Sequence, residues 1–255
     1  MKKLIVIAIA IFSFTSCQFT EEITLNENGT GNYNLKIDMG QMMSQKKSKD
    51  QDTEKKEKKE KVDSIINFSE LFKKLKKEDT NLSKEDLRLM KRMENLKLHM
   101  LVDEEKGEMK MDFSFPFKSL NDLKTIGDDI KRLDEIQKKK EDKKGEDPMN
   151  EIFTGISKSG KDVDYTYNGK KFTRKTILSK QAKKKAKEKE DTTSNNDLGI
   201  MKMFSYKLIY HFPKKIKSIS YKEAMLGTDG KTLIIEVPMD RLEKEPSLLD
   251  FDVKF

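Results

Sequence analysis

Few side chains in this 255-residue sequence have the types and spacing of a catalytic or metal site. The two histidines, His99 and His211, each fall in a predicted strand and face away from its apolar alternation, so we expect both at the surface. Neither belongs to an H-E-x-x-H motif, and a single cysteine offers no thiol cluster, which argues against a zinc site. The sequence therefore predicts no metal and no cofactor.

Two loop sequences come nearest to catalytic or calcium-binding patterns. Ser157 and Lys158 could be a serine–lysine pair, but adjacent residues on a loop are poorly placed for one, and the G-x-S-x-G spacing is missing. Asp162 and Asp164 begin like a calcium loop, yet Tyr167 stands where the sixth-position glycine is needed. The 45 acidic residues leave dispersed catalytic carboxylates open as an alternative that the sequence does not locate.

The start of the chain has the organisation of a secretory signal. Residues 2–3 are lysines, residues 4–14 are an almost unbroken apolar run, and two small residues, 15–16, precede Cys17. A transmembrane helix needs about 20 apolar residues, so this run is too short to cross a bilayer. We expect the signal to end at residue 16.

This arrangement resembles a bacterial lipoprotein signal that is cut between Ser16 and Cys17. In that family the sulfur and the freed amino group of the cysteine are acylated. The resemblance therefore implies lipidation at Cys17, by palmitate-type chains, and a mature protein held on a membrane of the cell envelope. Gln18 is not the Asp that signals inner-membrane retention in the family, which implies the outer membrane and leaves open on which of its faces the protein lies. Simple secretion is the alternative.

Charge dominates the composition. Charged residues make up 38% of the chain and hydrophobic residues 35%, so the core must be lean. Much of the charge lies in three segments without an apolar pattern, and we predict mobile, disordered insertions near 44–62, 138–148 and 180–196. The formal charge is +8. An exported basic protein could contact anionic lipids or glycans through the Lys-rich segments, rather than nucleic acid; interleaved acids also suit plain solubility. No protein partner is indicated.

Hydrophobic periodicity predicts a single α+β domain over 17–255, in which antiparallel β-hairpins form a sheet covered by two or three amphipathic helices. After a tether at 18–22, alternating strands flank turns that are centred on four short sequences: Asn28-Gly29, 104–107, Asn168-Gly169 and Asp229-Gly230. The helices are expected from Ile65 to Leu75, after a capping box at 83–86, and over roughly 119–138.

The second predicted hairpin ends in a stripe of methionine and phenylalanine at every other position, Met109 to Phe117. Such a stripe is typical of a strand face buried in a core. It could instead line a groove for lipid. Flanking amphipathic helices favour the core, because both need an apolar surface to cover.

The two ends of the sequence resemble the LppM-type lipoprotein domain over about 90 residues. The resemblance lies in a strand ending at Phe212-Pro213, the sequence Asp229-Gly230-Lys231-Thr232 entering a later strand, a closing strand, and the opening hairpin over 23–39. The family would imply a surface-anchored α+β domain without established enzymatic chemistry.

Three classes of function follow. The first is a lipid-anchored, non-catalytic module of the cell envelope that binds a partner or has a structural role, and it is our prediction. The alternatives are a lipid- or glycolipid-handling module, with the methionine and phenylalanine stripe lining a groove, and a hydrolase with dispersed carboxylates.

Overall fold

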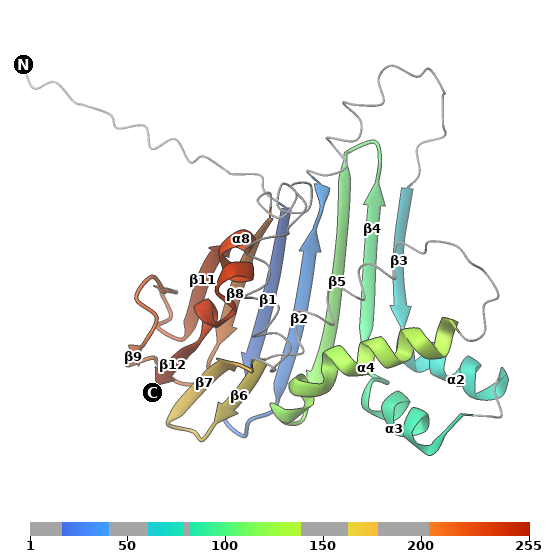
Figure 1. Cartoon of the computed structure of the whole chain (residues 1–255), viewed down its shortest axis with the longest axis horizontal. Coiled ribbons are helices and arrows are strands. Elements are labelled where there is room, and N and C mark those ends of the chain that lie inside the picture. Colours follow the sequence, from blue (N-terminus) through green and yellow to red (C-terminus); the bar gives the residue numbers. More distant parts are fainter. Residues whose placement is uncertain (1–16, 41–60, 79–81, 139–162, 178–203) are drawn as a thin grey trace, which may run out of the picture.

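The computed structural model describes residues 17–40, 61–78, 82–138, 163–177 and 204–255, which form an α+β fold with two sheets (Figure 1). The large sheet has the strand order β10-β11-β8-β1-β2-β5-β4-β3. Its strands are β1 (Cys17–Leu25), β2 (Gly31–Asp38), β3 (Lys61–Asn67), β4 (Lys97–Asp103), β5 (Glu108–Phe117), β8 (Phe204–His211), β10 (Met225–Leu226) and β11 (Thr232–Pro238).

The second sheet has four strands in the order β6-β7-β12-β9. They are β6 (Val163–Tyr167), β7 (Lys171–Thr176), β9 (Ser218–Ile219) and β12 (Phe251–Lys254). The helical elements are α2 (Phe68–Glu78), α3 (Lys84–Arg92), α4 (Asn121–Lys138), α8 (Met239–Lys244) and the 3₁₀ turn η2 (Pro246–Leu249).

The predicted hairpins are confirmed, because β1–β2, β4–β5 and β6–β7 all pair antiparallel. The prediction of a single antiparallel sheet is wrong in two respects. There are two sheets, and β1 pairs parallel with β8, with Cys17 opposite Phe204 and Thr24 opposite His211. Hairpin patterns report only pairings between neighbours in the sequence, whereas β1 and β8 lie almost the whole domain apart.

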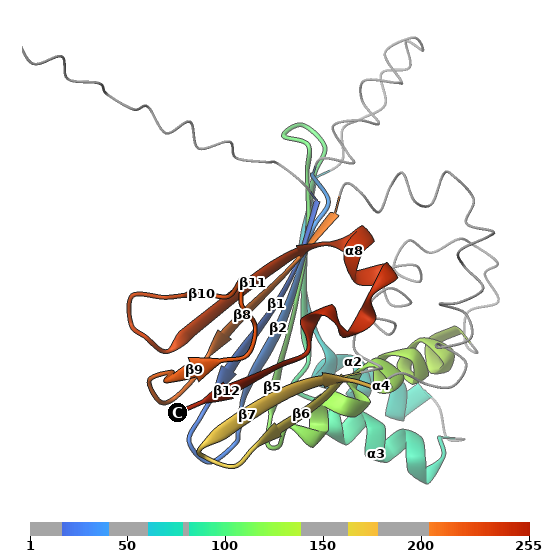
Figure 2. The same ribbon diagram turned by 60° about the vertical axis from the view of Figure 1, so that its left-hand side comes forward.

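The small sheet and helices α2, α3 and α4 lie side by side on one face of the large sheet (Figures 1 and 2). Burial agrees with this layering, because residues of β2 alternate between buried and less buried, with Tyr33, Leu35 and Ile37 turned to the core. The predicted stripe is confirmed as core. Met111, Phe113, Phe115 and Phe117 are at most 5% exposed, and they belong to one apolar cluster with residues of the helices and the small sheet.

Three predicted boundaries are wrong. Residues 18–22 are strand rather than tether, because β1 is already paired on both sides from its first residues. Ile65 and Ile66 lie in β3, not in a helix; β-branched side chains suit a strand, and β4 supplies its hydrogen-bonding partner. Lys61 and Val62 belong to the same strand rather than to an insertion.

The helix over 119–138 and the capping box are confirmed. Ser83 Oγ accepts a hydrogen bond from the Asp86 backbone N–H, and Asp86 accepts one from the Ser83 N–H. The predicted signal, 1–16, and most of the three predicted insertions lie outside the described residues. Among the described helices, none has the length and apolar character needed to cross a membrane.

Candidate functional site

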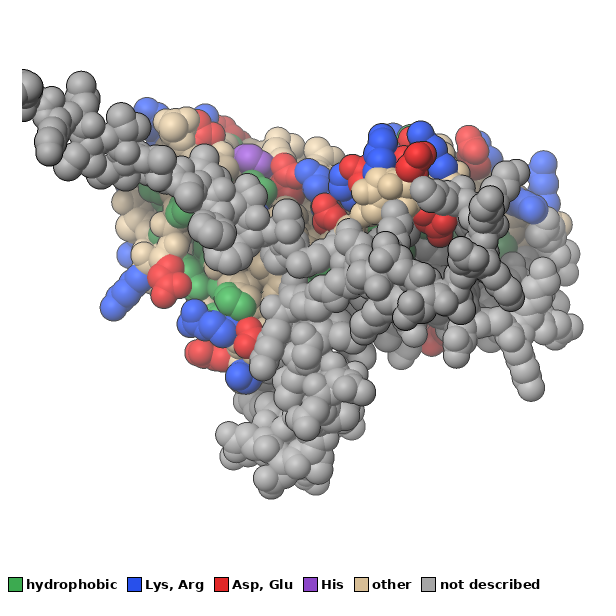
Figure 3. All heavy atoms as spheres, turned by 90° about the horizontal axis from the view of Figure 1, so that it is seen from above, with side chains coloured by type: hydrophobic (Ala, Val, Ile, Leu, Met, Phe, Trp, Pro, Cys, Tyr) green, Lys and Arg blue, Asp and Glu red, His purple; other side chains and the backbone are tan. Residues whose placement is uncertain are grey.

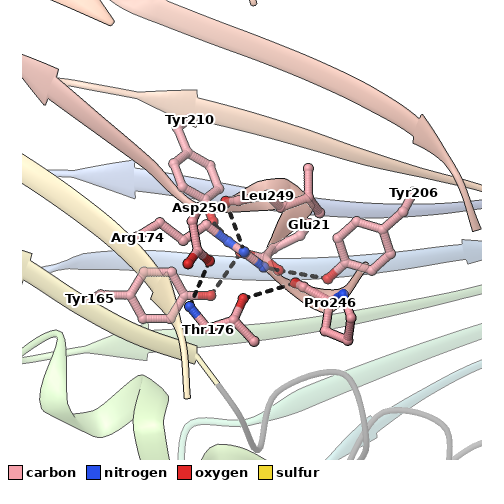
Figure 4. Close-up of polar contacts among 9 residues, drawn as sticks. All are labelled: Glu21, Tyr165, Arg174, Thr176, Tyr206, Tyr210, Pro246, Leu249 and Asp250. Atoms are coloured by element: carbon pink, nitrogen blue, oxygen red, sulfur yellow. Dashed lines mark hydrogen bonds and ion pairs between the residues drawn. The ribbon is translucent and has the colours of Figure 1, made fainter. Parts of the chain in front are cut away.

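A buried carboxylate, Glu21, lies between the two sheets at the centre of a polar cluster (Figure 4). It is 1% exposed. Tyr165 Oη donates to Glu21 Oε1 at 2.9 Å, Tyr206 Oη donates to Oε2 at 2.6 Å, and Tyr210 Oη also donates to Oε1. These donors come from β6 and β8, so the carboxylate of β1 is bonded to both sheets.

Arg174 of β7 balances the charge of this carboxylate. Its Nη2 lies 3.8 Å from Glu21 Oε2, its Nε donates to Tyr210 Oη at 3.2 Å, and its Nη1 donates to the carbonyl of Leu249 at 3.1 Å. The Arg174 side chain is 4% exposed, so the pair is shielded from water. Shielding makes the pair costly to break, although its formation also costs desolvation.

Burial and the nearby charge fix the protonation of the tyrosines. Burial raises the pKa of Tyr165, Tyr206 and Tyr210, and the negative charge of Glu21 raises each further. The three hydroxyls therefore stay protonated and act as donors. Burial opposes the charge of Arg174, but the surrounding acidic groups, Tyr210, Glu21, Tyr165 and Tyr206, together outweigh it and hold the pKa of the guanidinium well above its usual value.

This arrangement holds the sheets together rather than exposing a reactive group. A general acid or base must reach a proton on its substrate, directly or through one water. The members of the cluster, Glu21, Tyr165, Arg174, Tyr206 and Tyr210, are all at most 5% exposed. In this conformation the cluster is thus a closed polar contact between β1, β6, β7, β8 and η2.

A shallow depression of about 390 Å³ lies on the outer side of the small sheet. Its two carboxylates are engaged in bonds within the protein. Asp252 Oδ1 accepts from Lys171 Nζ at 2.9 Å and from Thr173 Oγ1 at 2.7 Å, while Asp250 Oδ1 accepts from the Thr176 N–H. The hydrogen bond from Lys171 lowers the pKa of Asp252. The carboxylates of the depression therefore already have partners within the protein.

Both histidines lie on the face of the large sheet that the helices do not cover, as expected for surface residues. His99 Nε2 is 2.8 Å from Asp63 Oδ1. His211 Nε2 is 3.2 Å from Glu22 Oε1, and His211 Nδ1 is 3.1 Å from Thr232 Oγ1. Partial burial disfavours the charge of Glu22, but the hydrogen bonds and charges of Lys36 and His211 together outweigh it and lower the pKa of the carboxyl.

The order Thr232–His211–Glu22 resembles a catalytic triad only in its composition. A nucleophilic hydroxyl must give its proton to the histidine. Here Thr232 Oγ1 donates to Asp229 Oδ2 at 2.8 Å, so towards His211 it can only accept. The arrangement lacks the hydrogen-bond direction that acyl transfer requires.

The remaining predicted sites are dispersed. Ser157, Lys158 and Asp162 lie outside the described residues. Asp164 pairs with Lys124 of α4. Among the described residues, no group of three or more His, Cys, Asp or Glu side chains could hold a metal ion. Cys17 is the first residue of β1, with its side chain on the buried face of the sheet.

Sequence reasoning missed Glu21 and Arg174. A usable signal was present, because Phe19, Glu21 and Ile23 alternate in one register and place Glu21 on an apolar face. In the same way, Arg174 follows Phe172 at the next inward position of β7. A charged residue in phase with apolar neighbours indicates a buried, paired charge.

No protein-family model matches the sequence, and no curated protein matches it. Among solved structures, the chain is similar to the folded domain of the LppM protein of Mycobacterium tuberculosis, determined by NMR. The two share 9% identity with a TM-score of 0.35, over 94% of this chain and 90% of that one. This likeness is too weak to carry an argument about function.

Proposed function

We propose that the chain is a non-catalytic, lipid-anchored module of the bacterial cell envelope. The observation that carries the proposal is the signal-like start of the sequence, which places small residues before Cys17 at the end of a short apolar run. In the fold, Cys17 begins β1. A lipid on Cys17 would therefore hold the first strand, and with it the domain, close to the bilayer.

The two other classes of function have less support. A lipid-handling groove would need an open cavity along the methionine and phenylalanine stripe of β5. Instead, Phe113 is 3% and Met111 0% exposed, and both belong to a continuous core. A hydrolase would need converging, accessible carboxylates. Glu21 is enclosed by tyrosines, while Asp86 and Asp129 bond to the arginines of helices α4 and α3.

Fatty-acid labelling tests the anchor. The full chain, expressed in a bacterial host with radioactive palmitate, should become labelled and sediment with membranes, whereas a Cys17→Ala chain should be unlabelled. One acyl chain gives only marginal binding, of about 10⁴ M⁻¹, so stable sedimentation requires a multiply acylated cysteine. Equal labelling of the Cys17→Ala chain would refute the proposal.

The finer proposal is that the acylated protein lies on the outer membrane. It rests on Gln18, which follows the acylated cysteine in place of the inner-membrane Asp. Density-gradient separation should place the native chain with the outer membrane and a Gln18→Asp chain with the inner one. A Gln18→Asn chain is the matched neutral control, and an identical distribution of all three would contradict this placement.

A further inference from the structure

Exposed lysines gather at the end of the two sheets that lies away from Cys17. We call this surface the basic corner. Its members are Lys170, Lys214, Lys215, Lys217, Lys231 and Lys254. The large sheet brings them to this end, because Thr24, His211 and Thr232 lie side by side at one end of β1, β8 and β11, while Cys17 and Phe204 begin β1 and β8 at the other.

Contacts between loops and strands assemble the basic corner. The Lys217 N–H donates to the carbonyl of Lys254 at 2.8 Å, and Lys214 Nζ donates to the carbonyl of Gly169, next to Lys170, at 3.0 Å. These bonds join the segment after β8 to β12 and to the β6–β7 turn. Residues that lie far apart in the sequence thus form one cationic surface.

The lysines of the basic corner are not held in ion pairs. Among the described residues, none of these six lysines forms an ion pair with a carboxylate, and Asp252, which lies near Lys254, pairs with Lys171. Lysines on the uncovered face of the large sheet behave differently; Lys36 pairs with Glu22 at 2.8 Å, and Lys207 with Glu236 at 3.6 Å. Figure 3 views the molecule from the end where β1 begins. On the described surface that it shows, acidic and basic side chains also lie side by side.

Two exposed apolar side chains adjoin these lysines. Met225 and Leu226 form β10, at the outer margin of the large sheet, and are 54% and 51% exposed (Figure 2). Lys231, a member of the basic corner, follows them in the sequence just before β11. The nearby Asp229 carboxylate is held in its turn by the backbone N–H groups of Lys231 and Thr232. Lysines beside exposed apolar side chains fit the anionic surface of a lipid bilayer.

We propose that the basic corner docks on the anionic surface of the same bilayer that holds the acylated Cys17, an inference that rests on the proposed lipid anchor. Eight residue steps along β1 separate Cys17 from the corner end by roughly 26 Å, and three strand spacings separate β1 from β10 by about 14 Å. With the β10 edge on the bilayer, the start of β1 lies about 14 Å from the surface, so the first residues of β1 have to leave the sheet for the acylated Cys17 to reach the lipid; about four extended residues span that distance. Anchoring then has two signals, acyl chains and a polybasic patch.

A fluorophore in the β10–β11 turn tests the docking. A Thr228→Cys chain, acylated at Cys17, offers one accessible thiol for an environment-sensitive label such as NBD. The purified acylated chain is reconstituted into phosphatidylcholine vesicles or into vesicles that also contain 30% phosphatidylglycerol. We expect brighter, blue-shifted emission only in the anionic vesicles, and loss of the difference at 0.5 M salt, since screening weakens surface attraction.

Matched charge variants identify the surface. Each lysine near an anionic surface contributes about fivefold to binding, so Lys215→Gln/Lys217→Gln/Lys231→Gln should weaken docking by about 100-fold and abolish the emission change. The control, Lys73→Gln/Lys76→Gln/Lys77→Gln on α2, removes the same charge from exposed positions and should behave as the parent. The pair Met225→Ser/Leu226→Ser should lower the emission change while salt sensitivity is kept.

The outcomes separate the anchor from the docking. A chain that fails to enter neutral vesicles because it is not acylated refutes the proposed function. A chain that enters but gives the same emission in neutral and anionic vesicles refutes the docking alone. Emission that changes only after separate anionic vesicles, or heparin, are added to protein in neutral vesicles also overturns the proposal, because the corner would then face another bilayer or a soluble polyanion.

Discussion

At the scale of single residues, the fold depends on a charged group placed where an apolar one is expected. Glu21 occupies an inward position of β1, and its two oxygens receive tyrosine hydroxyls from both sheets. Buried charges are tolerated when they are paired and hydrogen-bonded. The cluster therefore contributes to which strands face each other, while apolar contacts supply most of the stabilising free energy.

Removing one member of the buried pair should be worse than removing both. Arg174→Met leaves the Glu21 carboxylate buried without its cation and should lower the free energy of unfolding by about 3–5 kcal/mol. Glu21→Leu combined with Arg174→Met should recover much of that loss, because no uncompensated charge remains. Urea denaturation of the two variants measures the difference. A double variant no more stable than Arg174→Met alone would contradict this account.

A second prediction at this scale concerns Gly31, at the start of β2. A Cβ built there would lie 2.0 Å from the Thr24 carbonyl oxygen and 2.5 Å from Phe117 Cζ, so Gly31→Ala forces backbone to move. Overpacking of this kind costs about 1–3 kcal/mol or more. Gly29→Ala is the control. A Cβ at Gly29 meets no neighbouring atom, but the backbone φ of +82° disfavours alanine, so this substitution should lower the free energy of unfolding by about 1–2 kcal/mol. Thermal melts should place Gly31→Ala lower.

At the scale of elements, local sequence predicts hairpins well because turn chemistry is local. Gly29, Gly107, Gly169 and Gly230, one in each predicted turn, all have positive φ. The parallel β1–β8 pair, the second sheet and the Glu21 cluster were not predictable in this way. The tyrosine partners of Glu21 lie 144 to 189 residues away in the sequence. Hydrophobic periodicity predicts on which face of a strand a residue lies, but it does not predict which distant segment packs against that face.

The buried stripe of β5 gives the first prediction for an element. Phe113 is 3% exposed, so Phe113→Ala should lower the free energy of unfolding by roughly 3–5 kcal/mol. That is a large share of the 5–15 kcal/mol of a typical domain. The control Ile65→Ala removes an apolar side chain that is 63% exposed and should change stability by less than 1 kcal/mol. A similar melting temperature for both variants would show that the stripe is not core.

The start of α3 gives a pH-dependent prediction. The hydrogen bond from the Ser83 side chain, with help from Arg132, holds the pKa of Asp86 below its usual value of 3.8. A carboxyl with a lowered pKa in the folded state stabilises the fold above its unfolded pKa, and this contribution is lost as the pH falls through the folded one. Stability should therefore decline below about pH 4, and Asp86→Asn should remove this part of the decline. Urea midpoints between pH 2 and 6, with Asp112→Asn as control, measure it.

At the scale of the whole molecule, the two ends of β1 have different surroundings. Cys17 begins the strand on the buried face of the sheet, whereas the other end lies beside the exposed lysines of the basic corner. A lipid anchor at one end and a basic corner at the other would give the domain a fixed orientation on a surface. The mixed signs on the uncovered face, where Lys36 meets Glu22, would leave that face available to water or to a protein partner.

The last prediction follows from the position of Cys17. Its side chain is 1% exposed, and its register partner is Phe204 at the end of the β1–β8 ladder. Acyl chains on the sulfur cannot remain inside the core, so the acylated protein must open this end pair, which costs little because the ends of ladders have low local stability. Hydrogen exchange should be faster at residues 17–18 and 204–205 in the acylated chain than in a Cys17→Ala chain, and unchanged at the Ile23–Tyr210 pair. Equal protection from hydrogen exchange at residues 17–18 in both chains would mean that acylation leaves the end of the β1–β8 ladder closed. That result would contradict the close attachment of β1 to the bilayer.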